Sequence, residues 1–188
     1  MVSKQLHIIM PVKDSIEMAE KAILAIVNSG HSVCIYDDNS TIENANRLDQ
    51  IAQQHHIELI HISTLTDHPS PNYRLVLQHA RKRALLNQQN LVIVESDVMV
   101  KKDTLSLLAQ QAQAGVGMVA AVTTNEEGIF NFPYHYLLKM RYRKLAKETI
   151  STNKRFSFCC TLLTHEFLQK ADFELLDPTK NWFDVTIS

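Results

Sequence analysis

Short apolar runs alternate with amphipathic segments over the first 120 residues, and this alternation limits the folds open to the chain. The apolar runs span 6–12, 31–36, 57–62, 91–98 and 118–122, each of a length typical of a buried strand. Segments with helical apolar spacing lie between them at 17–28, 41–54, 73–87 and about 103–114. Strand and helix in alternation predict an α/β fold, in which helices cover both faces of a parallel sheet.

Bulk properties favour one globular domain and exclude several classes of protein. The chain has 188 residues and a formal net charge of -1, with 19 basic and 20 acidic side chains, which argues against nucleic acid as a partner. No apolar run reaches the ~20 residues of a membrane span, and the N-terminus is too soon polar for a secretory signal. The three cysteines lack disulfide or zinc-site spacing, so we expect reduced thiols and a cytoplasmic location.

The fourth apolar run, LVIVESDV at 91–98, leads directly into acidic residues. In open α/β sheets ligands bind at the carboxyl ends of strands. Glu95 and Asp97 lie two apart, so on a strand both would point to the same side. Carboxylates are the ligands that Mg²⁺ and Mn²⁺ take, which predicts a metal site. The alternative is that the two acids merely begin a solvated loop.

A second pair of acids, Asp37 and Asp38, follows the apolar run at 31–36. The chain has neither the G-x-G-x-x-G turn nor the Walker loop through which many α/β proteins bind phosphate. Carboxylates at two strand ends would instead offer a divalent metal to the phosphates, and this combination fits a nucleotide-sugar site.

Three segments of the first half resemble family 2 glycosyltransferases of the GT-A fold. IIMPVKD at 8–14 resembles the family's first strand. IYDDNST at 35–41 resembles its Asp-Asp-Gly-Ser-Thr segment, with Asn39 in place of glycine. ARKRALLNQQNLVIVESDV at 80–98 resembles the helix and strand that lead into the family's DxD motif, with Glu95 as the first acid.

Two further segments extend this resemblance to the end of the chain. FSFCCTLLTHEFLQKADFELLD at 156–177 resembles the family's acceptor-side strand and helix, although the usual glycine pair is missing. NWFDVTIS at 181–188 resembles the acid-rich segment that follows, with Asp184 kept and Phe183 and Thr186 in place of acids.

The resemblance implies a GT-A fold, with a Rossmann-like, mostly parallel sheet and an acceptor-side α+β portion at the C-terminus. One domain would span 1–188, with a nucleotide-binding half at about 1–123 and an acceptor-side half at about 124–188. The chain stops without an obvious final element, which is typical of either a truncated chain or a minimal domain.

The resemblance also assigns roles to residues. Asp97 would hold Mn²⁺ or Mg²⁺ on the donor diphosphate, Glu95 would reach the ribose or a metal-bound water, and Asp184 would be the general base. The other donor-site candidates, of which Asp38 is the first choice for the uracil or ribose, are Pro11, Val12, Asp37, Asp38, Arg81 and Ser96. For these polar residues the structural alternative is a capped loop or a solvated helix face.

The reaction implied is a metal-dependent, inverting transfer of a sugar from a nucleotide-diphosphate donor, expected to be a UDP-sugar, to an acceptor hydroxyl. A catalytically silent nucleotide-sugar-binding module of the same fold is the alternative. Sugar-phosphate nucleotidyl transfer would need a glycine-rich basic loop, which PVKDS at 11–15 lacks.

A basic amphipathic helix is predicted at 134–148. Such a helix can lie on an anionic membrane, which would place the protein at the inner face of the membrane and suit a glycan or lipid-linked acceptor. The alternative is an ordinary helix with a solvated basic face.

Overall fold

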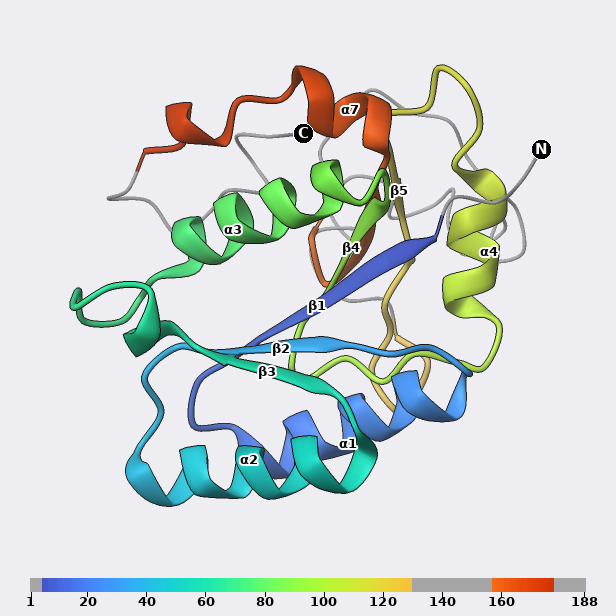
Figure 1. The fold of residues 1–188 in the computed structure, drawn as a ribbon. Coiled ribbons are helices and arrows are strands. Elements are labelled where there is room, and N and C mark those ends of the chain that lie inside the picture. Colours follow the sequence, from blue (N-terminus) through green and yellow to red (C-terminus); the bar gives the residue numbers. More distant parts are fainter. Residues whose placement is uncertain (1–4, 130–156, 178–188) are drawn as a thin grey trace.

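A six-stranded sheet forms the centre of the computed structural model, which describes residues 5–129 and 157–177 (Figure 1). Its strands are β1 (Leu6–Val12), β2 (Cys34–Asp37), β3 (Glu58–His61), β4 (Asn90–Val94), β5 (Met118–Ala120) and β6 (Cys160–Leu163). They lie in the order β3-β2-β1-β4-β6-β5. The first four strands are parallel to one another, whereas β6 runs antiparallel to both β4 and β5. The mixed, mostly parallel sheet confirms the predicted α/β fold.

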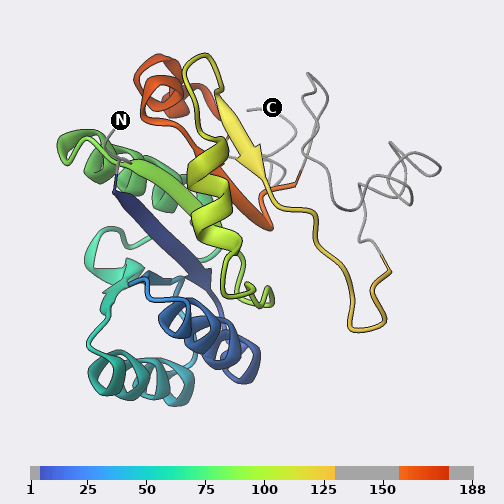
Figure 2. The same cartoon turned by 90° about the vertical axis from the view of Figure 1, so that its right-hand side faces the viewer.

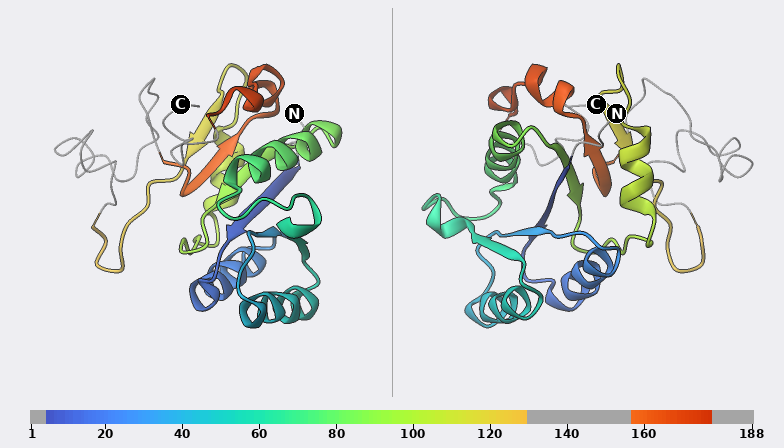
Figure 3. Two further views of the ribbon diagram at one scale, coloured as in Figure 1. Left: turned by 90° about the vertical axis from the view of Figure 1, so that its left-hand side faces the viewer. Right: turned by 45° about the vertical axis from the view of Figure 1, so that its right-hand side comes forward.

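Helices cover both faces of this sheet. They are α1 (Ile16–Asn28), α2 (Ile42–His55), α3 (Tyr73–Leu86), α4 (Thr104–Gln111) and α7 (His165–Lys170), with 3-10 turns η1 (Ile62–Thr64) and η2 (Phe173–Leu175). The core on one face is built from α1, α2 and α4, and the core on the other from α3, α7 and η2. Figure 2 and Figure 3 show these two layers on either side of the strands.

The strand β1 shows why both faces need cover. Ile8 and Met10 point into the core beneath α1, and Ile9 points into the core beneath α3; all three are at most 2% exposed. A strand buried on both sides reads as a continuous apolar run, which is how the sequence marks it. Burial of each such side chain contributes roughly 1.5–3 kcal/mol to folding.

One strand boundary differs from the prediction and changes how the acids are presented. β4 ends at Val94, and the backbone N–H of Val98 donates to the carbonyl of Glu95 at 3.0 Å. Residues 95–98 therefore form a turn after the strand. Glu95 and Asp97 are therefore not alternate residues of a strand, and the two-residue strand period does not place them on one side.

Three other predicted elements lie outside the described residues. They are the basic helix at 134–148, the acid-rich segment at 181–188 and its proposed general base Asp184. Among the described helices, none combines the length and the hydropathy that a membrane crossing needs.

Candidate functional site

The carboxyl ends of the parallel strands bring the predicted acids to one edge of the sheet. β1 and β2 end side by side, because Val12 pairs with Asp37 and the N–H of Asp38 donates to the Val12 carbonyl at 2.8 Å. β4 lies on the other side of β1 and ends in the turn at 95–98. Ligands of open α/β sheets bind at this edge, so the acids lie where a site is expected.

Asp38 is buried and holds the β3–α3 loop. Ser70 Oγ and the N–H of Asn72 both donate to Asp38 Oδ2 at 2.8 Å, and Asn72 Nδ2 donates to Oδ1 at 2.8 Å. A carboxylate offers about four lone-pair sites, so one site remains after these three bonds. Asp38 can therefore take one further N–H or O–H donor, such as a base or a sugar hydroxyl.

Asp37 is more deeply buried than Asp38 and contacts a different set of residues. Its Oδ1 accepts from the N–H of Ser40 at 3.1 Å, and its Oδ2 lies 2.8 Å from His61 Nδ1. Both acids are buried, with Asp37 3% exposed and Asp38 8% exposed.

Asn39 explains how this turn departs from the family's usual sequence. Its φ of 58° is in the left-handed region, which favours glycine, and asparagine is among the few other residues that adopt it readily. Asn39 Nδ2 also donates to the carbonyl of His68 at 3.3 Å. Asn39 therefore adopts a conformation that favours glycine, and its side chain ties the turn to the β3–α3 loop.

The β1–α1 loop is fastened to the same turn. Lys13 Nζ donates to the carbonyls of Asp38 and Asn39, at 3.4 and 3.2 Å. Asp14 Oδ1 accepts from the N–H of Thr41 at 2.8 Å and from Asn44 Nδ2 at 3.0 Å. These two hydrogen bonds hold the pKa of Asp14 below its usual value. Asp14 precedes α1 in the chain, and its carboxylate accepts from the N-cap and the first turn of α2.

The turn after β4 presents Glu95 and Asp97 differently. Tyr73 Oη donates to Glu95 Oε1 at 3.1 Å, and the N–H of Glu95 donates to the Cys159 carbonyl at 2.9 Å. Glu95 is half-buried and fixed from two sides, whereas Asp97 is exposed. Burial raises the pKa of the Cys159 thiol, and the charges of Glu95 and Asp97 raise it further.

The remaining donor-site candidates lie in two places. Pro11 and Val12 form the end of β1 and Ser96 lies in the turn after β4, so all three are at the carboxyl edge. Arg81 is not, because its Nε donates to the Leu168 carbonyl at 2.9 Å and its guanidinium lies 5.7 Å from the Phe173 ring centroid. The contacts of Arg81 are therefore with α7 and η2, and we do not assign it to the donor site.

The donor set at this edge fits a metal that arrives with its ligand. Among the described residues, no group of three or more His, Cys, Asp or Glu side chains is arranged to hold a metal ion. Mg²⁺ and Mn²⁺ are commonly held by one or two carboxylates, with substrate phosphates and water completing the shell. An exposed Asp97 beside a fixed Glu95 supplies such a set.

Several residues of the site could not be found from the sequence. Ser70, Asn72 and Tyr73 contact the acids from the β3–α3 connection, and His61 contacts Asp37 from β3. A proline-bounded polar loop was the only local signal for the first three. Asn72 is 34 residues from Asp38, and such a distant contact leaves no mark in local spacing.

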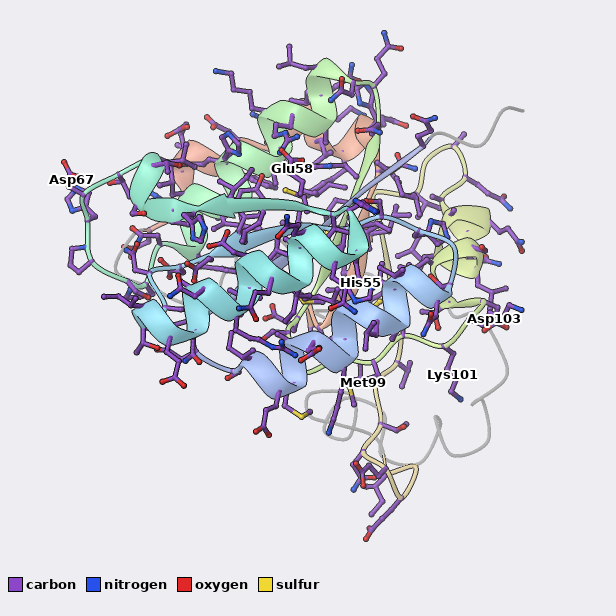
Figure 4. All side chains as sticks on the ribbon, turned by 60° about the horizontal axis from the view of Figure 1, so that its bottom comes forward. His55, Glu58, Asp67, Met99, Lys101 and Asp103 are labelled. Atoms are coloured by element: carbon purple, nitrogen blue, oxygen red, sulfur yellow. The ribbon has the colours of Figure 1, made fainter. Side chains whose placement is uncertain are left out.

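Replacing Asp38 with alanine should lower the free energy of unfolding by about 1–3 kcal/mol, because the buried N–H of Asn72 would lose its acceptor. Urea denaturation measures this loss. Asp67→Ala is the matched control, since Asp67 is an exposed acid of the same loop (Figure 4). Equal stability of the two variants would show that the Asp38 bonds do not hold the loop.

Comparison with known proteins identifies the family. A profile of glycosyl transferase family 2 matches residues 7–171. No curated protein matches the chain in sequence. Among solved structures, glucosyl-3-phosphoglycerate synthase from Mycobacterium tuberculosis in complex with Mn²⁺, UDP and glucosyl-3-phosphoglycerate is similar, with a TM-score of 0.54 and 15% identity. This match covers 87% of the present chain and 57% of that enzyme, so the chain spans little more than half of that enzyme's length.

Two further solved structures are similar to the chain. The complex of that synthase with Mn²⁺ and UDP-glucose matches with a TM-score of 0.52 and 13% identity, over 87% of this chain and 57% of that one. S. aureus TarS matches with a TM-score of 0.45 and 17% identity, over 56% of this chain and 19% of that one. The family profile runs from β1 to the end of α7 and includes both acidic turns. The chain belongs to glycosyl transferase family 2.

Proposed function

We propose that this protein is a metal-dependent, inverting glycosyltransferase that moves a sugar from a UDP-sugar to an acceptor hydroxyl. One observation carries the proposal: the Asp37–Asp38 turn and the Glu95–Ser96–Asp97 turn lie at the same edge of the sheet, on either side of the end of β1. The first turn suits a nucleoside, and the second suits the diphosphate attached to it.

The nucleoside end of the site rests on Asp38. Its carboxylate retains one lone-pair site after binding Ser70 and Asn72, and uracil presents an N–H donor at its N3 position. Pro11 and Val12 would line the base pocket largely through their backbone, and Asp37 would fix the turn. Cytosine has an acceptor where uracil has this donor, so a carboxylate discriminates between the two pyrimidines.

The diphosphate end rests on Asp97, with Glu95 and Ser96 beside it. Several carboxylates at one edge repel a diphosphate unless a cation lies between them. A divalent ion there would act as a Lewis acid on the charge that develops on the leaving nucleoside diphosphate. In this proposal Asp97 holds the ion, and Tyr73 keeps the longer Glu95 side chain in place beside it.

The acceptor end rests on Asp184. A carboxylate within hydrogen-bond reach of the acceptor hydroxyl takes its proton as the oxygen attacks the anomeric carbon. The C–O bond to the diphosphate breaks on the opposite side of the sugar, so the anomeric configuration inverts. A glycan or a lipid-linked molecule is the acceptor class we propose, with the basic segment at 134–148 as the contact to an anionic surface.

A nucleotide-sugar-binding module without catalysis is the second candidate. The replacement of acids by Phe183 and Thr186 around Asp184 favours it. Such a module would bind the donor as the enzyme does and would leave every acceptor unchanged.

Calorimetric titration with UDP and CDP in the presence of Mn²⁺ tests the donor assignment. We expect UDP to bind about 5- to 150-fold more tightly than CDP, because cytosine leaves the Asp38 carboxylate without a donor. CDP is the matched control, since it has the same size and the same diphosphate. Equal affinity for the two nucleotides would contradict base recognition by Asp38.

A further inference from the structure

His61 lies between two carboxylates, one of which belongs to the Asp37–Asp38 turn that we assign to the nucleoside. His61 Nδ1 is 2.8 Å from Asp37 Oδ2, and His61 Nε2 is 3.2 Å from Asp49 Oδ1. The three residues come from β2, β3 and α2, so the chain of contacts joins two strands to the helix between them. Exposure rises outward along it: the Asp37 side chain is 4% exposed, His61 30% and Asp49 59%.

The geometry constrains the protonation state of the imidazole. A neutral ring has one N–H and one lone pair, and only the cationic ring donates from both nitrogens. Both nitrogens of His61 face a carboxylate at hydrogen-bond distance, so both contacts are hydrogen bonds only when the ring is protonated. Burial lowers the pKa of His61, but the hydrogen bonds and charges of Asp37 and Asp49 outweigh it, and the pKa is raised.

The charged groups that face His61 can be named from each element around it. Asp37 faces it from β2 and Asp49 faces it from α2, and these two carboxylates are the charges that act on the ring within the described residues. The carbonyl of His61 accepts from Thr64 Oγ1 at 2.7 Å, which anchors the backbone of the residue itself.

Asp37 links His61 to the turn that carries Asp38. Asp37 Oδ2 contacts the imidazole, and Asp37 Oδ1 accepts from the N–H of Ser40 at 3.1 Å. One carboxylate therefore joins the turn at 37–40 to the β3 residue His61. Asp38 is the next residue, and its carboxylate already holds the β3–α3 loop. Asp37 therefore connects His61 to the backbone of the residue that we assign to the uracil.

We propose that His61 is a positioning residue of the donor site, which in its cationic form holds Asp37 and thereby orients Asp38 toward the nucleoside. This inference rests on the proposed function, since it concerns the same pocket. It makes donor affinity depend on the charge of a residue that does not touch the donor. Because the pKa of His61 is raised, donor affinity should be highest where His61 is protonated and should fall as the pH rises through the His61 pKa of the free protein.

The test is the affinity for UDP-glucose in Mn²⁺ between pH 5.5 and 8.5, for the wild type, Asp49→Asn and Glu43→Gln. UDP-glucose is used because its diphosphate is esterified at both ends and has no secondary phosphate proton in this range. Asp49→Asn removes one charge from an exposed position of α2, and Glu43→Gln removes one charge from another exposed position of the same helix. NMR of the His61 ring in the same three proteins gives its pKa directly.

We expect wild-type affinity to fall about three- to tenfold as the pH rises, the equivalent of one hydrogen bond. In Asp49→Asn the His61 pKa and the midpoint of the affinity profile should both move to lower pH, and Glu43→Gln should reproduce the wild-type profile. The inference would be overturned, while the proposed function stands, if the midpoint of the affinity profile does not follow the His61 pKa. The same shift of the midpoint in Glu43→Gln would also overturn it. No binding of UDP-glucose or of UDP at any pH would overturn the proposed function and this role of His61 with it.

Discussion

Replacing Asp97 with alanine should lower the rate of sugar transfer at least about 100-fold. Loss of a single group that stabilises developing negative charge commonly costs this much or more. Asp97 is the exposed carboxylate of the turn after β4, whereas Glu95 is already engaged by Tyr73. Asp97 is therefore the more accessible carboxylate for a metal on the leaving diphosphate. The measurement is the initial rate of product formation at saturating donor and Mn²⁺.

Asp103→Ala is the control for this variant. Asp103 is an exposed acid in the connection between β4 and α4, and it makes no side-chain capping bond to that helix. The Asp103→Ala variant loses one negative charge from the same connection as Asp97→Ala and should keep wild-type activity. If Asp97→Ala transfers sugar as fast as Asp103→Ala, Asp97 is an ordinary loop residue and the metal assignment fails.

Replacing Asp184 with asparagine should abolish transfer and leave donor binding intact. General-base catalysis contributes about 10²- to 10⁴-fold, and an amide of the same shape cannot take the acceptor's proton. The two readouts are the transfer rate and the calorimetric affinity for UDP with Mn²⁺. A fall in rate of this size at unchanged affinity would support a role for Asp184 in the reaction rather than in the fold.

Asp172→Asn is the matched change in the neighbouring part of the chain. Asp172 Oδ1 accepts from the N–H of Glu174 at 3.0 Å in an exposed turn, so its replacement should affect the turn and spare the reaction. Transfer by Asp184→Asn at a near wild-type rate would show that Asp184 is structural. Wild-type protein that binds UDP and transfers to no acceptor would favour the binding module.

The strands and helices followed from periodicity because apolar burial is a local property of the sequence. The run at 6–12 became β1 with the same bounds, and the segment at 73–87 became α3 with one residue fewer. The strand β4 ends at Val94, where the apolar residues end, so the turn at 95–98 agrees with the alternative that the acids begin a loop. The antiparallel direction of β6 was not predicted either, because strand direction depends on the path of the chain between strands.

The outcome for Arg81 has a geometric cause. The helix α3 begins beside the site, where Tyr73 contacts Glu95, and runs back along the sheet to the start of β4. At 1.5 Å per residue, Arg81 lies about 12 Å further along the helix than Tyr73. Its neighbours are therefore Leu168 and Phe173, and the residue of α3 that reaches the acidic turn is Tyr73. The direction of the helix decides between the two, and it follows from the predicted alternation, because a helix that joins two parallel strands begins at their carboxyl edge.

The central claim is that the two acidic turns form one site for a nucleoside diphosphate and its metal. Calorimetric titration of the wild-type protein with UDP, with Mn²⁺ and then with EDTA, tests it most directly. We predict that UDP binds in Mn²⁺ and that its affinity falls at least about tenfold without the ion, because the carboxylates of this edge then face the diphosphate unscreened. UDP affinity that is the same with and without Mn²⁺, or no binding under either condition, would contradict the claim.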